Sequence, residues 1–163
     1  MASHEIVVRA ISDSSEALNI GFILCKGNIT NFETIENQFV SSVKSILTFT
    51  SRPVIFRIVS NDINWVNDLI LEKIAEPEKM RNFWFDVRTD ETPNALEPLK
   101  RHLKFKGCGH LKVTFHHTFS DVENLLLLDA DTILLRPVEE LFAEMEKFGS
   151  NAGKGPILEL DVT

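Results

Sequence analysis

Residues 125–137 read LLLLDADTILLRP, an apolar run that passes directly into two carboxylates and then turns apolar again. A short continuous run of leucines is typical of a strand buried on both faces. Asp129 and Asp131 follow it at positions i and i+2. On an extended backbone alternate side chains point the same way, so both carboxylates could face one hard cation such as Mn²⁺ or Mg²⁺. Unpaired carboxylates buried beside leucines would be costly, which favours a bound metal.

Two other interpretations of the acidic pair remain open. A D-x-D tripeptide is common, and it can be no more than a solvated strand end or helix cap. Haloacid-dehalogenase phosphatases also use two such aspartates, the first as nucleophile and the second as acid/base. Their pattern has Thr or Val two places after the second aspartate, where this chain has Ile133. The sequence after Asp131 is also too short for their later motifs.

Strand and helix patterns alternate along the rest of the chain. Apolar or β-rich runs predict strands at 20–25, 54–59, 83–87, 125–128 and 157–162. Apolar residues spaced three and four apart predict helices at 32–47, 65–74, 108–119 and 137–148. This alternation predicts an α/β fold with a mostly parallel sheet and helices on both faces. Ligands of such sheets bind beyond the carboxyl ends of the strands. The turns after Cys25 and after Leu128 are therefore the candidate site positions.

Length and composition exclude several classes of protein. The chain has 163 residues, which fits one domain, here assigned to residues 19–163 after a polar leader at 1–18. Its net charge of -7 disfavours a nucleic-acid partner. No apolar stretch reaches the roughly 18 residues of a membrane helix, and the first residues form neither a signal peptide nor an anchor. Two cysteines, Cys25 and Cys108, are too few for a disulfide framework.

The segment 125–142 resembles the signature of glycosyltransferase family 8. The family's pattern is an apolar strand, D-x-D-T, further apolar residues and a helix with an acidic-Leu-aromatic sequence. Segments 21–27, 56–62 and 108–115 resemble the family's first strand, its second strand and the helix that precedes the D-x-D. Within the family, segments 51–53, 106–108 and 135–138 look most like the animal glucoside xylosyltransferases.

The resemblance implies a retaining transferase of the GT-A (Rossmann-like) fold, with a UDP-sugar donor, UDP-xylose, and protein-linked glucose as acceptor. It implies a metal site for Mn²⁺, or Mg²⁺, at Asp129 and Asp131. The donor-binding residues that it implies are Cys25, Lys26, Gly27, Asp62, Lys112, Asp129, Ala130 and Asp131. No catalytic acid or base is named, because in such retaining enzymes the departing phosphate is thought to take the acceptor's proton.

The family also has a longer C-terminal part, with an acceptor pocket and a His-x-x-Gly-x-x-Lys-Pro motif that this sequence lacks. We therefore expect the N-terminal donor half of a truncated enzyme, which would expose a sheet edge and invite self-association. The alternative is a non-catalytic fragment that binds UDP or another protein. The resemblance implies the lumen of the ER or Golgi as the compartment.

Overall fold

The computed structural model describes residues 16–26, 32–74, 82–89 and 111–147, and the structural findings concern these ranges. Their elements are β1 (Leu18–Leu24), α1 (Phe32–Phe49), β2 (Val54–Ser60), α2 (Ile63–Lys73), β3 (Phe83–Arg88), α4 (Leu111–Thr118), β4 (Leu125–Leu127) and α5 (Glu139–Glu146). The strands and helices predicted within these ranges are confirmed, with ends that differ by a few residues. The predicted strand at 157–162 and the start of the helix at Cys108 lie outside the described residues.

The four described strands form one parallel sheet in the order β3-β2-β1-β4. β1 and β2 occupy its centre and pair along their whole lengths, from Leu18 opposite Val54 to Leu24 opposite Ser60. β4 is much shorter and pairs only with the first half of β1, where Leu127 stands opposite Gly21. Parallel strands direct their carboxyl ends to the same edge of the sheet, so the turns after β1, β2 and β4 lie along one edge.

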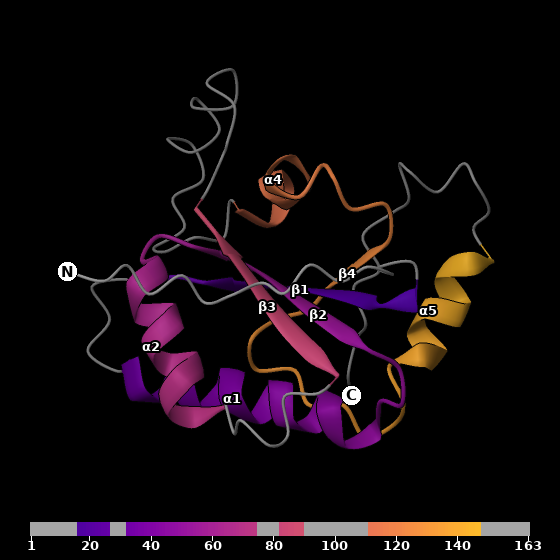
Figure 1. Cartoon of the computed structure of the whole chain (residues 1–163), viewed down its shortest axis with the longest axis horizontal. Helices are drawn as coiled ribbons and strands as arrows, with labels where there is room; N and C mark the ends of the chain where they lie inside the picture. Colours follow the sequence, from indigo (N-terminus) through magenta and orange to yellow (C-terminus); the bar gives the residue numbers. More distant parts are fainter. Residues whose placement is uncertain (1–15, 27–31, 75–81, 90–110, 148–163) are drawn as a thin grey trace.

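The sheet is covered on both faces, as predicted, with α1 and α2 on one side and α4 on the other (Figure 1). The larger core lies on the side of α1 and α2. Its fully buried side chains alternate along β1 and β2, as the two-residue period of a strand requires: Leu18, Ile20, Phe22, Leu24, Val54, Phe56 and Ile58. Phe22 meets Phe39 of α1 edge to face, with ring centroids 5.3 Å apart.

The opposite face holds a smaller core under α4. Leu111, Phe115 and Phe119 are buried there against Val59. Gly21 allows this close approach, since a Cβ atom at Gly21 would lie 2.9 Å from Cζ of Phe115. The fold thus sets the position of α4 through the contact of one aromatic ring with the backbone of β1.

Arg88, at the end of β3, holds the C-terminal end of α4 against the sheet. Its guanidinium donates to the Thr118 carbonyl at 2.9 Å and pairs with the carboxylates of Asp86 at 2.9 Å and Asp121 at 2.8 Å. It also lies over the ring of Phe119, 4.5 Å from the centroid. Hydrogen bonds from Arg88 lower the pKa of the Asp121 carboxyl. α4 is therefore fixed at both ends, by apolar packing and by ion pairs.

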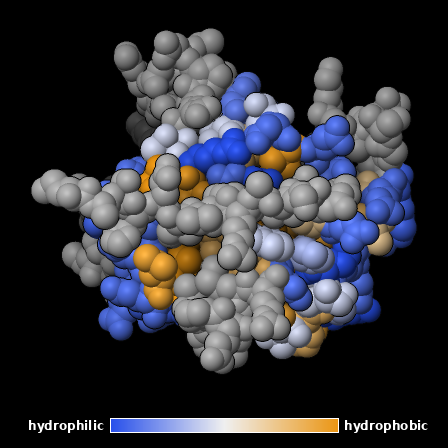
Figure 2. All heavy atoms as spheres, in the orientation of Figure 1, coloured by the Kyte–Doolittle hydropathy of each residue, from blue (hydrophilic) through white to orange (hydrophobic). Residues whose placement is uncertain are grey.

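The described part of the surface is mostly hydrophilic on the side shown in Figure 2, with hydrophobic side chains in separate patches. Large hydrophobic residues that remain exposed are Phe49, Leu71, Val113, Ile133 and Leu135. No helix in the described ranges combines the length and the apolar character that crossing a membrane requires. The expected self-association through a sheet edge remains a prediction.

Candidate functional site

Asp129 and Asp131 lie in a turn rather than on a strand. β4 ends at Leu127, and the last bond to β1 runs from the Leu128 amide to the Gly21 carbonyl at 3.0 Å. The Thr132 amide then donates to the Asp129 carbonyl at 3.0 Å, which closes a β-turn. We call residues 129–132 the carboxylate turn. The premise that the two aspartates follow each other on an extended backbone is therefore wrong, because the chain leaves the sheet once its pairing with β1 ends.

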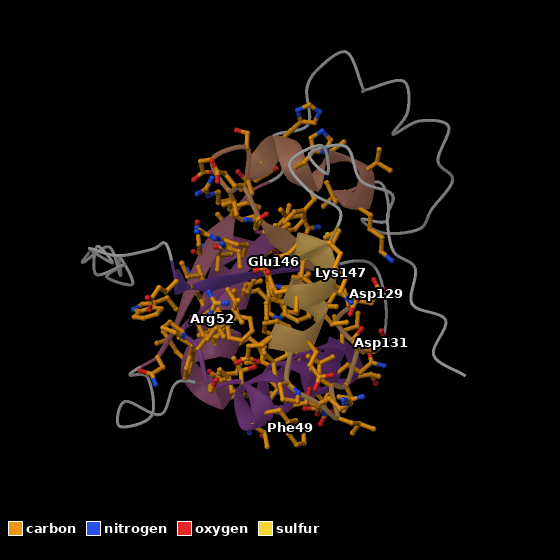
Figure 3. The ribbon with its side chains drawn as sticks, turned by 90° about the vertical axis from the view of Figure 1, so that its right-hand side faces the viewer. Phe49, Arg52, Asp129, Asp131, Glu146 and Lys147 are labelled. Atoms are coloured by element: carbon orange, nitrogen blue, oxygen red, sulfur yellow. The ribbon has the colours of Figure 1, made fainter. Side chains whose placement is uncertain are left out.

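The carboxylate turn nevertheless places both acidic side chains outward. Leu128 is buried and Ala130 packs against the larger core, whereas Asp129 and Asp131 are exposed. Figure 3 shows the two labelled carboxylates on the same side of the molecule. The side chain of Asp129 is 58% exposed, so the argument that burial among leucines makes these carboxylates costly is also wrong. They are available to a ligand from solvent.

Lys112 of α4 contacts the carboxylate turn. Its Nζ lies 2.6 Å from Oδ1 of Asp129, and both side chains are about half exposed. Leu111 and Phe115 of the same helix are buried in the smaller core, whereas Lys112 is exposed on the outer face of α4. Two of the residues predicted to bind the donor are thus in contact. An ion pair this exposed contributes at most about 1 kcal/mol, so a ligand can readily rearrange it.

Two contacts from distant parts of the chain fix the segment after the carboxylate turn. The Leu134 amide donates to Oγ of Ser45, a residue of α1, at 3.0 Å. Glu139 at the start of α5 accepts hydrogen bonds on Oε1 from the amides of Ser51 at 2.8 Å and Arg52 at 3.2 Å. Burial raises the pKa of the Glu139 carboxyl, but these bonds outweigh it and the pKa is lowered. Ser45 and Glu139 were not predicted from the sequence, because their hydrogen-bond partners lie 87 to 89 residues away along the chain.

A second polar cluster joins the ends of β1 and β2. Lys26 and Asn61 exchange two hydrogen bonds, from the Lys26 amide to Oδ1 at 2.8 Å and from Nδ2 to the Lys26 carbonyl at 3.0 Å. Nζ of Lys26 also lies 3.1 Å from Oδ2 of Asp62. Oδ1 of Asp62 accepts from the Trp65 amide and caps α2. The bond from Trp65, together with Lys26, lowers the pKa of the Asp62 carboxyl.

The two polar groups are separate along the edge of the sheet. β4 ends opposite Gly21, three residues before β1 ends at Leu24. At roughly 3.3 Å per residue, the end of β4 is offset by about 10 Å from the end of β1. Cys25, which follows β1, is half buried and disulfide-bonded, so its thiol is not a free ligand. The predicted donor-binding residue Gly27 lies outside the described residues.

The donors at the carboxylate turn fit a metal that is shared with a ligand. Among the described residues, no group of three or more His, Cys, Asp or Glu side chains could hold a metal ion. Asp129 and Asp131 supply two carboxylates. Magnesium-like ions are commonly held by one or two carboxylates, and phosphate and water oxygens complete their coordination. The pair therefore fits such an ion arriving with a phosphate ligand, and does not form a closed structural site.

No protein-family model matches the chain. Among curated proteins it is similar to glucoside xylosyltransferase 1 of Mus musculus, with 26% identity over 113 residues, and to that of Rattus norvegicus, with 22% over 138 residues. These matches cover 69% and 83% of this chain, but 27% and 29% of the relatives. The chain therefore spans less than a third of the length of these relatives.

Among solved structures the chain resembles the apo form of mouse xyloside xylosyltransferase 1. The TM-score is 0.60 with 14% identity, over 81% of this chain and 49% of that chain. At this level of identity the likeness shows the fold alone. The predicted α/β fold of the GT-A type is thereby confirmed, and it corresponds to about half of the solved chain.

Proposed function

We propose that this chain is the donor-binding part of a retaining glycosyltransferase that uses a UDP-sugar, UDP-xylose, as its donor. The observation that carries the proposal is the contact of Lys112 with Asp129, beside Asp131, at the edge of the sheet where α/β proteins bind ligands. The names and the fold of the similar proteins support a xylosyltransferase. A protein-linked glucose would be the acceptor.

The carboxylate turn would hold the diphosphate end of the donor. Asp129 and Asp131 would bind Mn²⁺, or Mg²⁺, through one or both carboxylates, and Ala130 leaves room for the ligand to approach the backbone. When bound, the metal would stabilise the charge that develops on the departing UDP. Lys112 would offer its ammonium group to a phosphate oxygen, as a point charge rather than as the two-pronged donor that arginine provides.

The cluster of Lys26, Asn61 and Asp62 would lie at the nucleoside end. The offset of about 10 Å between the ends of β4 and β1 suits a ligand that lies along the sheet edge, with its base and its phosphates at opposite ends. Both oxygens of Asp62 already have partners, one at the cap of α2 and one on Lys26. Asp62 would therefore act chiefly by holding Lys26, rather than through the direct donor contact that the resemblance implies.

A lumenal compartment of the secretory pathway is part of the proposal. Disulfide bonds form and persist mainly in oxidising compartments, and Cys25 is disulfide-bonded. The ER or Golgi lumen satisfies this condition and is where glycoprotein acceptors are found.

The second candidate is a non-catalytic fragment that binds UDP. It shares the contact of Lys112 with Asp129 at the carboxylate turn, and it requires no acceptor site. Transfer of xylose to a glucosylated peptide by the purified chain, above a metal-free control, would decide against this candidate. UDP binding without transfer would decide for it.

Calorimetric titration with UDP, with and without Mn²⁺, tests the donor site that both candidates share. We expect UDP binding that depends on Mn²⁺, is lost in Asp131→Asn and persists in Asp68→Asn. Asp68 is an exposed residue of α2 and controls for the change in net charge. Failure of the folded wild-type chain to bind UDP, or equal binding by both variants, would refute the assignment.

A further inference from the structure

One carboxylate of the candidate metal site already has a cation beside it. Nζ of Lys112 lies 2.6 Å from Oδ1 of Asp129, a close ion pair. An ion such as Mg²⁺ would bind a carboxylate oxygen at about 2.0–2.1 Å. Two cations on one carboxylate group repel each other, so a metal ion and Lys112 compete for Asp129.

The fold allows Lys112 to release Asp129 without moving α4. Leu111 and Phe115 anchor this helix on the sheet, with 2% and 3% of their surface exposed. Only the lysine side chain is free to change its position, since it is 52% exposed and carries its ammonium on a flexible stem. The side chain can therefore exchange one anionic partner for another nearby.

We propose that Lys112 acts as a placeholder for the metal ion, and that Asp129 exchanges it for the metal when a diphosphate offers the ammonium group a new partner. This rests on the proposed function. A metal ion alone must displace Lys112 and leave it unpaired, whereas metal and diphosphate together give every charge a partner. Binding of the two is therefore positively coupled, and the free protein binds the metal weakly.

The test compares variants of the 163-residue chain for Mn²⁺ affinity without nucleotide, measured by the electron paramagnetic resonance signal of free Mn²⁺. Lys112→Met removes the placeholder, so we expect Mn²⁺ to bind about two- to fivefold more tightly, the range that an exposed ion pair allows. In the same variant UDP affinity with saturating Mn²⁺ should fall about tenfold or more, because the phosphate loses a charged donor. The opposite signs of these effects distinguish a placeholder from a residue that merely stabilises the fold.

Two further variants complete the design. Lys73→Met removes a lysine that pairs with Glu36 at 2.8 Å on another part of the surface, so it controls for net charge. Lys112→Arg keeps the positive charge and should keep the weak metal affinity. Thermal unfolding shows that each variant is folded, and Lys112→Gln replaces Lys112→Met should that variant not fold.

The outcomes separate this inference from the proposed function. If Lys112→Met binds Mn²⁺ alone no more tightly than Lys73→Met, while the wild type binds UDP in a Mn²⁺-dependent manner, the placeholder is refuted and the proposed function stands. If the folded wild type binds no UDP with Mn²⁺, both fail.

Discussion

Gly21→Ala tests the packing that positions α4, and with it Lys112, over the sheet. A Cβ atom at this position would lie 2.9 Å from Cζ and 3.0 Å from Cε1 of Phe115, and 3.1 Å from Cδ1 of Leu127. The ring of Phe115 is buried and packs on Phe119, with centroids 5.0 Å apart, so it cannot easily move away. Either α4 shifts or the contacts become strained.

The expected loss of stability follows from two opposing contributions. Inserting a methyl group into a well-packed core costs about 1–3 kcal/mol. Replacing glycine by alanine also restricts the unfolded chain, which stabilises the folded state by about 0.4–1 kcal/mol where the backbone conformation suits alanine. We therefore expect Gly21→Ala to lower the free energy of unfolding by about 1–2 kcal/mol.

Urea unfolding of Gly21→Ala, Phe115→Leu and the double variant measures this contact. Phe115→Leu removes part of the ring that the new Cβ would meet. The double variant should therefore lose about 1 kcal/mol less stability than the two single variants lose in sum. Additive losses, or a Gly21→Ala variant as stable as the wild type, would refute the view that Gly21 is required for the approach of α4.

Two further predictions concern the support of the site and the response to pH. Ser45→Ala should lower the free energy of unfolding by about 1 kcal/mol and weaken Mn²⁺-dependent UDP binding, because the Leu134 amide loses its acceptor. The control Ser41→Ala removes only a hydrogen bond within its own helix. Equal affinities of the two variants for UDP, measured by calorimetry, would contradict this role of Ser45. The hydrogen bond from Lys73 lowers the pKa of Glu36 below its ordinary value of 4.5. The contribution of Glu36 to stability is therefore present above pH 4.5 and is lost as the pH falls through the lowered pKa. Urea unfolding should therefore show Glu36→Gln to be less stable than the wild type at pH 7 and closer to it at pH 3, and a constant difference would contradict the ion pair.

Local patterns in the sequence predict the elements of the fold and their general arrangement. Buried strands such as 20–25 are short apolar runs, and the helix that begins at Phe32 repeats its apolar residues every three or four positions, so both signals lie within a few neighbouring residues. The cap of α2 by Asp62 is a local contact as well, since its partner, the Trp65 amide, is three residues away. The alternation of strands and helices predicts a parallel sheet, and the carboxyl ends of its strands predict the edge at which a ligand would bind.

The construction of the site depends on contacts between distant segments, which local patterns do not predict. The register of β4 on β1 ends the strand at Leu127 and places the aspartates in an exposed turn, an outcome that depends on pairing between distant segments. The contact of Lys112 with Asp129 depends on how closely α4 packs on Gly21, and the support from Ser45 joins positions 89 residues apart. Such contacts are set by the packing of the whole chain, and no local period in the sequence encodes them.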